Sequence, residues 1–229
     1  LEGARLPQPG RQLAARLGMP NLVGIDMGGT SFDVVVVDAG RAAAVTEGSI
    51  DGVPVRLPMI EMRTIGTGGG SIAWIDRAGR LRVGPRSAGA QPGPACYGRG
   101  GEEATVTDAN LALGRIDTRR FAAGRMPLDA GRAREAITRK IGTPLGLGLE
   151  EAAEGIVRIS VANMAQAIRL SLYSRGLDPA DFALVSFGGA GGLHAAEIAE
   201  EVGVGTVVYP LAAGTFSAFG ILSSDIVHS

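Results

Sequence analysis

Lysine and cysteine are nearly absent from this sequence, and each absence excludes a class of protein. The chain has 229 residues, of which Lys140 is the only lysine and Cys96 the only cysteine. Because no Gly-Lys pair occurs, a phosphate-binding loop of the GxxxxGKS/T type is excluded. A single cysteine can form neither an internal disulfide framework nor a cysteine-based zinc cage.

Long apolar runs and excess charge are lacking as well. No stretch reaches the ~20 apolar residues that a helix needs to cross a membrane, so we expect no membrane partner. The net charge of −1 gives no electrostatic reason to expect nucleic acid or anionic lipid. The opening residues show no basic segment followed by an apolar one, so we predict no signal peptide and a cytoplasmic location.

The most informative stretch is VGIDMGGTSFDVVVVD, residues 23–38. It predicts a strand ending in Asp26, a tight Gly-Gly turn, and a second strand whose β-branched run suits burial on both faces. Gly28 and Gly29 can adopt positive φ and let another group approach the backbone closely. Successive amide groups at such a turn form a concave donor patch for phosphate, and Asp26 could face a hydrated Mg²⁺. The alternative is an ordinary β-hairpin.

The rest of the chain predicts strands that alternate with helices. The expected strands are 22–27, 33–38, 42–47, 72–76, 81–85, 182–187 and 206–209. The expected helices are 11–18, 107–114, 130–141, 149–175, 193–202 and 214–223. Three antiparallel strands at the beginning and strand–helix–strand alternation at the end indicate an α/β fold with some parallel pairing.

Glycine and proline become dense between residues 49 and 104, where periodicity is weak. We therefore expect a core of about 20–48 and 105–229, with a glycine-rich subdomain inserted at about 49–104. The loops at 66–71 and 92–98 are long and irregular, and such loops are often functional. The alternative is a small inserted subdomain whose loops only connect its strands, and the sequence leaves the role of both loops open.

A second candidate site follows the buried strand at 182–187. It consists of a glycine-rich turn: Gly188, Gly189, Ala190, Gly191 and Gly192. A glycine turn between a strand and a helix directs free amide groups toward an anion. Because His194 occupies the third glycine position, the turn is not a dinucleotide fingerprint, and a Rossmann-type dehydrogenase is a weak hypothesis. The alternative is a tight junction without a ligand.

Other reactive side chains give less support to a catalytic role. His194 at a helix start more often packs or caps than catalyses. A triad of His194 with Ser186 or Ser217 would need a GxSxG turn, which the chain lacks, so we reject a serine hydrolase. Nothing near Cys96 in the sequence would lower the pKa of its thiol, and we expect a buried structural thiol. Asp26 is the one carboxylate that we assign to a site.

Five segments together resemble the hydantoinase A / 5-oxoprolinase family, which includes acetone carboxylase-type subunits and belongs to the actin-like ATPase superfamily. They are residues 24–40 (GIDMGGTSFDVVVVDAG), 64–101, 105–116, 150–169 and 182–203 (FALVSFGGAGGLHAAEIAEEVG), and the resemblance covers about 16–229. The stretch at 23–38 also resembles the phosphate-binding hairpin of actin, sugar kinases and chaperone ATPases. Two departures are Phe32, where the family usually has Thr, and Gly192, where it usually has Pro.

The resemblance implies an actin-like (ribonuclease H-like) α/β lobe, with a mixed sheet opened by a three-stranded antiparallel unit and flanked by helices. It implies ATP and Mg²⁺ as cofactors. Asp26 takes the catalytic and metal-facing role, and the turn at 188–192 contacts adenosine. The implied phosphate-binding residues are Gly28, Gly29, Thr30 and Ser31.

The function that the resemblance implies is the nucleotide-binding lobe of an ATP-dependent hydrolase of cyclic amides, such as hydantoin or 5-oxoproline. Relatives carry a further N-terminal lobe and work with a hydantoinase B-type partner subunit, so we expect a piece of a longer chain that is inactive alone. One alternative is a subunit of an ATP-dependent ketone carboxylase. Another is a non-catalytic nucleotide switch of the same fold. Phe32 and Gly192 keep this alternative open, and Phe32 removes a hydroxyl beside the phosphate turn.

Overall fold

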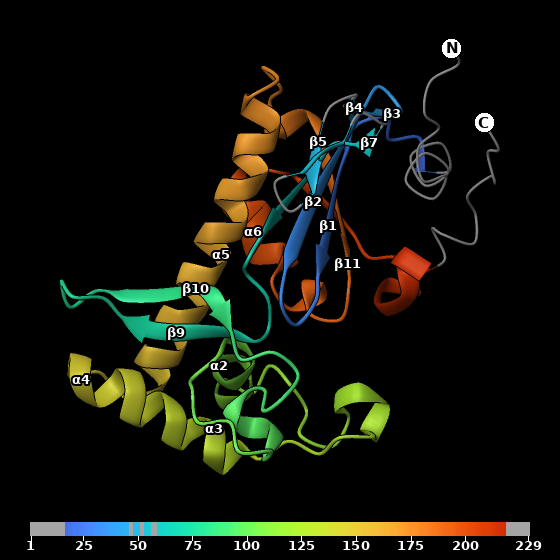
Figure 1. Cartoon of the computed structure of the whole chain (residues 1–229). Coiled ribbons are helices and arrows are strands. Elements are labelled where there is room, and N and C mark those ends of the chain that lie inside the picture. Colours follow the sequence, from blue (N-terminus) through green and yellow to red (C-terminus); the bar gives the residue numbers. More distant parts are fainter. Residues whose placement is uncertain (1–16, 46–47, 51–52, 56–58, 219–229) are drawn as a thin grey trace. The chain divides into compact units, whose positions relative to one another are not determined.

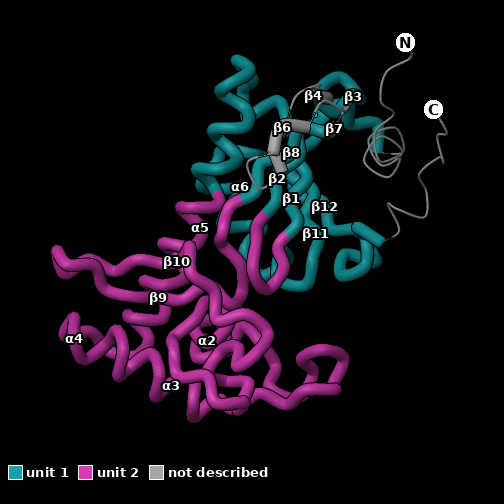
Figure 2. Tube along the Cα trace, in the orientation of Figure 1, with its two compact units in different colours: residues 1–26, 33–64, 165–229 teal, residues 27–32, 65–164 magenta. Residues whose placement is uncertain are grey.

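A computed structural model describes residues 17–45, 48–50, 53–55 and 59–218. The described residues form two compact units, which Figure 2 shows in different colours. Unit 1 takes its residues from the ranges 1–26, 33–64 and 165–229, and unit 2 from 27–32 and 65–164. Unit 2 therefore combines residues 65–104 of the predicted insert with 105–164, and the limits of that insert, 49–104, stay a prediction.

Unit 1 is built on a mixed sheet in which β1, β2 and β11 lie side by side (Figure 1). The strand order is β12-β11-β1-β2-β3, and β8 also pairs with β2. The strands are β1 (Leu22–Met27), β2 (Phe32–Asp38), β3 (Arg41–Ala42), β8 (Met62–Ile65), β11 (Ala183–Phe187) and β12 (Thr206–Val208). Pairing is parallel between β1 and β11 and between β11 and β12, but antiparallel between β2 and β3. The predicted α/β class with a mixed sheet is confirmed.

The valine run of β2 is buried as its sequence predicts. Val34, Val36 and Val37 are each at most 3% exposed, so both faces of this strand are covered. A strand buried on both faces is typical of the central part of an α/β sheet. One core cluster joins three strands of the sheet through Leu22, Val37, Ala183 and Val185.

The predicted strand at 42–47 pairs with β2 only at its start, in β3, and its predicted extent is wrong. After β3 the chain forms β4 (Ala44–Val45), which leaves the main sheet and pairs with β7 (Met59–Ile60). At the junction, the amide of Glu61 donates a hydrogen bond of 2.9 Å to the Ala43 carbonyl. The chain thus changes its strand partner after two residues, and residues 46–47 lie outside the described part. The short strands β5 (Gly48–Ile50) and β6 (Val53–Val55) pair with each other.

Unit 2 contains the predicted strand pair and the predicted short helices. Strands β9 (Ser71–Ile75) and β10 (Leu81–Ser87) pair antiparallel. The helical elements are η1 (Ala95–Tyr97), α2 (Val106–Ala112), η2 (Phe121–Gly124), α3 (Ala130–Ile137), the π-helix η3 (Thr138–Gly142) and α4 (Thr143–Leu145). A capping box between Thr105 and Asp108 fixes the start of α2. The core of this region joins these elements through Cys96, Leu111, Leu128 and Ala133.

The long helix α5 (Leu149–Tyr173) agrees with the predicted helix at 149–175 and supplies residues to both units. It ends before Gly176, whose φ of 70° suits the left-handed position after a helix. The remaining elements are η4 (Pro179–Asp181), η5 (Gly191–Leu193), α6 (Ala195–Val202) and η6 (Ala213–Thr215). Most of the predicted helix at 11–18, and the end of the one at 214–223, lie outside the described residues. No helix within the described ranges is long and apolar enough to cross a membrane.

Candidate functional site

The turn between β1 and β2, residues 28–31, is held by hydrogen bonds within unit 2. The Gly28 amide donates to the Ser31 carbonyl at 3.2 Å, which closes the turn on itself. The carbonyls of Gly28 and Gly29 accept hydrogen bonds from the amides of Gly69 (3.0 Å) and Gly70 (2.6 Å). The turn therefore has both glycine carbonyls engaged by the loop at 66–71.

The next two amides of this turn remain available to a ligand. Gly29 and Thr30 are exposed, and within the described residues their amide groups donate to no protein acceptor. Adjacent unengaged amides on an exposed turn suit a phosphate oxygen or another anion. This arrangement is the feature of unit 2 that most favours the predicted phosphate turn.

Gly28 and Gly29 do not use the positive φ that glycine can adopt. Neither residue is among the glycines with positive φ, so the turn itself does not require a left-handed residue there. A Cβ atom built on either glycine would meet nothing within 4 Å. The space around the turn is open in the structure, which leaves room for a group to approach the backbone.

Asp26 lies in unit 1, where its side chain has a defined partner. The hydroxyl of Ser217 donates a hydrogen bond of 2.6 Å to Asp26 Oδ2. In the parallel register of β1 and β11, Asp26 pairs with Phe187, the last residue of β11. Asp26 thus stands beside the strand end from which the turn at 188–192 begins, and carboxyl ends of parallel strands are where α/β proteins place their ligand sites.

The described residues around Asp26 do not form a metal cage. Within the described ranges, no group of three or more His, Cys, Asp or Glu side chains gathers to hold a metal ion. Mg²⁺ keeps several waters and is commonly bound by one or two carboxylates together with substrate phosphates. A single carboxylate with a fixed orientation therefore fits Mg²⁺ that arrives with a nucleotide, and it does not fit a metal caged by protein side chains.

In the second glycine turn Gly188 has a positive φ, with a value of 83°, whereas Gly191 does not. The Gly188 amide donates to the Ala213 carbonyl at 3.0 Å. Gly191 is buried at the start of η5, whereas Gly189 is exposed and has nothing within 4 Å of a Cβ position. Gly189 is therefore the residue of this turn that another molecule can approach most easily.

His194 is fully buried, which agrees with a packing role. Its carbonyl accepts a hydrogen bond from the Ile198 amide at 2.9 Å and so opens helix α6, while its side chain makes no capping bond. The Nδ1 atom lies 4.0 Å from a carboxylate oxygen of Glu197. Ser186 is also buried, so neither residue presents its side chain to a substrate in this structure.

Cys96 is buried beside a buried carboxylate. Burial, reinforced by the negative charge of Asp108, raises the pKa of the Cys96 thiol well above its usual range. Asp108 accepts hydrogen bonds from the amides of Ala95 (3.3 Å) and Cys96 (2.8 Å) and from both donors of Thr105. This environment keeps the thiol protonated, which agrees with a structural and not a nucleophilic cysteine.

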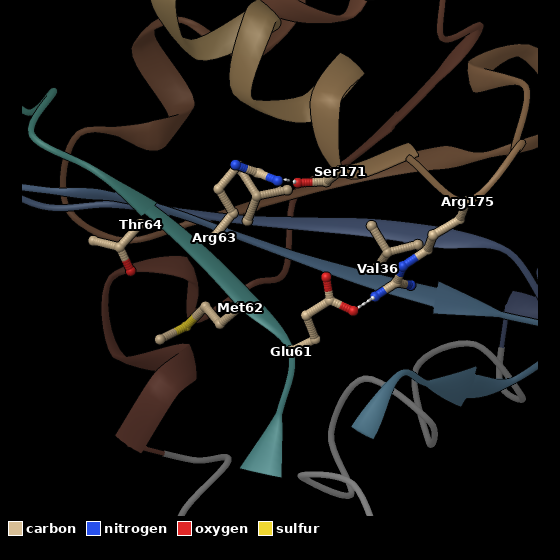
Figure 3. A pocket seen from close by; sticks show the side chains of 8 residues that line it. Val36, Glu61, Met62, Arg63, Thr64, Ser171 and Arg175 are labelled. Carbon is tan, nitrogen blue, oxygen red and sulfur yellow. Dashed lines mark hydrogen bonds and ion pairs between the residues drawn. The ribbon is translucent and has the colours of Figure 1, made fainter. Parts of the chain in front are cut away.

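A cavity of about 310 Å³ in unit 1 contains none of the predicted site residues (Figure 3). It is lined by Val34, Val36, Glu61, Met62, Arg63, Thr64, Ser171 and Arg175. Two interactions cross it: Arg63 Nε donates to Ser171 Oγ at 3.2 Å, and Arg175 forms an ion pair with Glu61 at 2.5 Å. These contacts attach β8 and the residue before it to the end of α5. Because Arg63, Glu61 and Arg175 are paired within the protein, their presence in the cavity does not indicate a ligand.

Sequence reasoning missed that the loop at 66–71 donates hydrogen bonds to the turn at 28–31. It also missed Thr107, whose amide and hydroxyl both donate to the Gly69 carbonyl, at 2.7 Å and 2.8 Å. The signal in the sequence was the run of three glycines at 68–70, because consecutive glycines outside a tight turn indicate a close backbone approach.

The fold defines a mixed α/β protein with glycine turns after β1 and β11. The chain belongs to the hydantoinase/oxoprolinase family, whose model matches residues 10–229. The resemblance found in the sequence is thereby confirmed.

Two relatives and one solved structure illustrate the similarity. The chain is 46% identical to the caprolactamase subunit alpha of Pseudomonas jessenii, over 97% of this chain and 32% of that protein. It is 47% identical to the acetophenone carboxylase gamma subunit of Aromatoleum aromaticum, over 94% of this chain and 29% of that protein. The solved ATP-dependent caprolactamase from P. jessenii superposes with a TM-score of 0.86, over 93% of this chain and 31% of that one. The chain thus spans about a third of the length of these proteins.

Proposed function

We propose that this chain is the nucleotide-binding lobe of an ATP-dependent hydrolase of cyclic amides, of the hydantoin or 5-oxoproline type. The observation that carries the proposal is the exposed pair of amides at Gly29 and Thr30, on a turn whose carbonyls are already engaged. Membership of the hydantoinase/oxoprolinase family and the similarity to an ATP-dependent caprolactamase support this reaction class.

Each candidate residue has a proposed role. In unit 2 the phosphate oxygens accept hydrogen bonds from the amides of Gly29 and Thr30, with Gly28 and Ser31 shaping the turn. Bound ATP with Mg²⁺ supplies the phosphoryl chemistry that makes a stable lactam bond easier to cleave. The protein contributes orientation and charge: its donors fix the phosphates and exclude other arrangements.

In unit 1 we assign Asp26 to Mg²⁺ and the turn at 188–192 to the adenosine. The hydrogen bond from Ser217 holds one carboxylate oxygen of Asp26, so the side chain is already oriented before the metal binds. The exposed backbone at Gly189 offers a surface on which the nucleoside can lie. The second glycine turn thus has a role that needs no side chain.

We also propose that the chain acts as part of a larger assembly. The similar proteins are named as subunits, and this chain spans about a third of their length. A further N-terminal lobe and a hydantoinase B-type partner subunit are the components that we propose, with a cytoplasmic location. The cyclic amide or carbonyl substrate is bound with their help.

The second candidate is a subunit of an ATP-dependent ketone carboxylase. It is favoured by the 47% identity to the acetophenone carboxylase gamma subunit, which is close to the 46% identity to the caprolactamase subunit. A non-catalytic switch has less support, because Phe32 is fully buried in β2. The residue at position 32 contributes to the core, so its exchange does not remove a hydroxyl from the exposed side of the turn.

ATP turnover by the full-length protein with its partner subunit tests the proposal. The assay compares hydantoin, 5-oxoproline and caprolactam with acetophenone or acetone plus bicarbonate. Amide-stimulated ATP hydrolysis with a ring-opened product is the expected result. Stimulation only by a ketone with bicarbonate would support the carboxylase, and nucleotide binding without substrate-stimulated turnover would support the switch.

A further inference from the structure

The loop at 66–71 has the composition of a phosphate-binding loop, but its amides are already used. The Gly68 amide donates to Ser71 Oγ at 2.8 Å, and the amides of Gly69 and Gly70 donate to the carbonyls of the turn at 28–31. A glycine loop binds an anion only through amides that have no other acceptor. The three glycines therefore serve another purpose than direct phosphate binding.

The loop lies closer to the turn than any side chain would permit. A Cβ atom at Gly68 would lie 2.7 Å from the Thr30 nitrogen and 2.8 Å from the Gly29 carbonyl carbon. At Gly70 a Cβ atom would lie 2.9 Å from the Gly29 oxygen. Both contacts are to backbone, which cannot move aside as a flexible side chain can. The need for glycine thus falls on the loop at 66–71, and Gly28 and Gly29 themselves are in open space.

Thr107 connects this loop to helix α2. Its amide and its hydroxyl both donate to the Gly69 carbonyl, and the side chain is only 7% exposed. A Cβ atom at Gly69 would lie 2.8 Å from Thr107 Oγ1. Since the capping box at Thr105 fixes the start of α2, a continuous chain of hydrogen bonds leads from the helix through Gly69 to Gly28.

We propose that Gly68, Gly69, Gly70 and Thr107 are positioning residues that hold the turn at 28–31 in its phosphate-binding shape. The inference rests on the proposed function, because it assigns these residues to the same nucleotide site. The loop engages the two glycine carbonyls of the turn, whose partial negative charge would repel a phosphate, and leaves the amides of Gly29 and Thr30 without a protein acceptor among the described residues. When a turn is ordered before the ligand arrives, the entropy cost of ordering it does not reduce the binding affinity.

Nucleotide binding by variants of the full-length protein tests this inference. Gly68→Ala forces the turn away from the loop, and Thr107→Val removes one of the two donors to Gly69 while keeping the side-chain volume. Thr107→Ser restores the hydroxyl. Gly148→Ala is the matched control in unit 2, because a Cβ atom there meets nothing within 4 Å and its φ is not positive. Calorimetry measures the affinities for a non-hydrolysable ATP analogue and for adenosine, which has no phosphate.

We expect Gly68→Ala to lower the Tm, because backbone must shift to admit the Cβ atom, and to weaken binding of the ATP analogue at least tenfold while the affinity for adenosine changes little. Thr107→Val should weaken binding of the analogue about fivefold, and Thr107→Ser and Gly148→Ala should behave as wild type. If Gly68→Ala does not fold, the comparison of Thr107→Val with Thr107→Ser decides. A purely structural role would lower the Tm and affect both ligands equally.

Two other results have distinct meanings. A wild-type protein that binds no ATP analogue at all would overturn the proposed function. A wild-type protein that binds it, with unchanged affinity in both Gly68→Ala and Thr107→Val, would overturn the positioning role alone. Equal losses for adenosine and the analogue, accompanied by a lower Tm, would also overturn the positioning role.

Discussion

The hydroxyl of Ser217 lies 2.6 Å from Asp26 Oδ2, although the two residues are separated by 191 positions in the sequence. Ser217 follows η6 near the end of the described chain, and Asp26 stands near the end of β1. The bond gives the carboxylate a fixed orientation at the edge of the sheet where β11 also ends. Oriented carboxylates are better prepared to hold a metal ion than mobile ones.

Asp26→Asn should lower Mg²⁺-dependent ATP turnover of the full-length protein roughly 100-fold or more while the fold remains intact. The amide has almost the same shape as the carboxylate and can still bond to Ser217, but it carries no charge to offset that of Mg²⁺. Steady-state ATPase rates at increasing Mg²⁺ concentration, with circular dichroism as the check on folding, measure the effect. Turnover that survives with an unchanged dependence on Mg²⁺ would assign Asp26 a structural role.

Gly189→Val should weaken nucleotide binding by the full-length protein at least about tenfold, which corresponds to about 1.4 kcal/mol. A Cβ atom there meets no protein atom within 4 Å, so the branched side chain would project into the space that we assign to the nucleoside. Gly205→Val is the matched control in unit 1, because Gly205 is equally exposed and equally unobstructed. Calorimetry gives the two affinities and thermal unfolding the stabilities. Equal affinities for wild type and Gly189→Val would remove this turn from the adenosine site.

The buried thiol of Cys96 should make the protein less stable as the pH rises. Since its pKa is raised in the folded state, the thiol stays protonated there while the unfolded chain loses the proton above about pH 8.5. The unfolded state then binds fewer protons than the folded state, so the free energy of unfolding falls with pH. Urea unfolding between pH 7 and pH 10 measures this fall, and Cys96→Ser should reduce it. Catalysis by Cys96→Ser close to wild type is also expected, and a large loss of activity would show that the thiol takes part in the chemistry.

Asp108→Ala should lower the free energy of unfolding by about 3 kcal/mol. The carboxylate is fully buried and accepts four hydrogen bonds, which join the segment around Cys96 to the start of α2. Alanine would leave those donors buried without an acceptor, and it would also remove the capping box. Chemical denaturation measures the loss, with Asp117→Ala, an exposed acidic residue in the same unit, as the control. Equal stabilities of the two variants would contradict this account of the buried carboxylate.

Local features were predicted well from the sequence because their causes lie within a few residues. The strand ending near Asp26, the turn after it and the valine run of β2 follow from alternation and β-branching, and α5 follows from helical spacing. The extent of the third predicted strand, 42–47, was wrong because the chain pairs with β7 from β4 onward. The sequence of β7 gives no sign of this pairing.

The candidate site was predicted only in part for the same reason. Composition alone identified the residues of both glycine turns. It did not predict the conformation of the turns, in which Gly188 is the one glycine with a positive φ. The loop at 66–71 donates hydrogen bonds to a turn about 40 residues earlier in the chain. Such a contact has no local signature beyond the glycines themselves.

The most direct test of the central claim is a crystal structure of the full-length protein with a non-hydrolysable ATP analogue. The account predicts phosphate oxygens within hydrogen-bond distance of the amides of Gly29 and Thr30, with the carbonyls of Gly28 and Gly29 still bonded to the loop at 66–71. Phosphates bound elsewhere, with these two amides facing solvent, would contradict it.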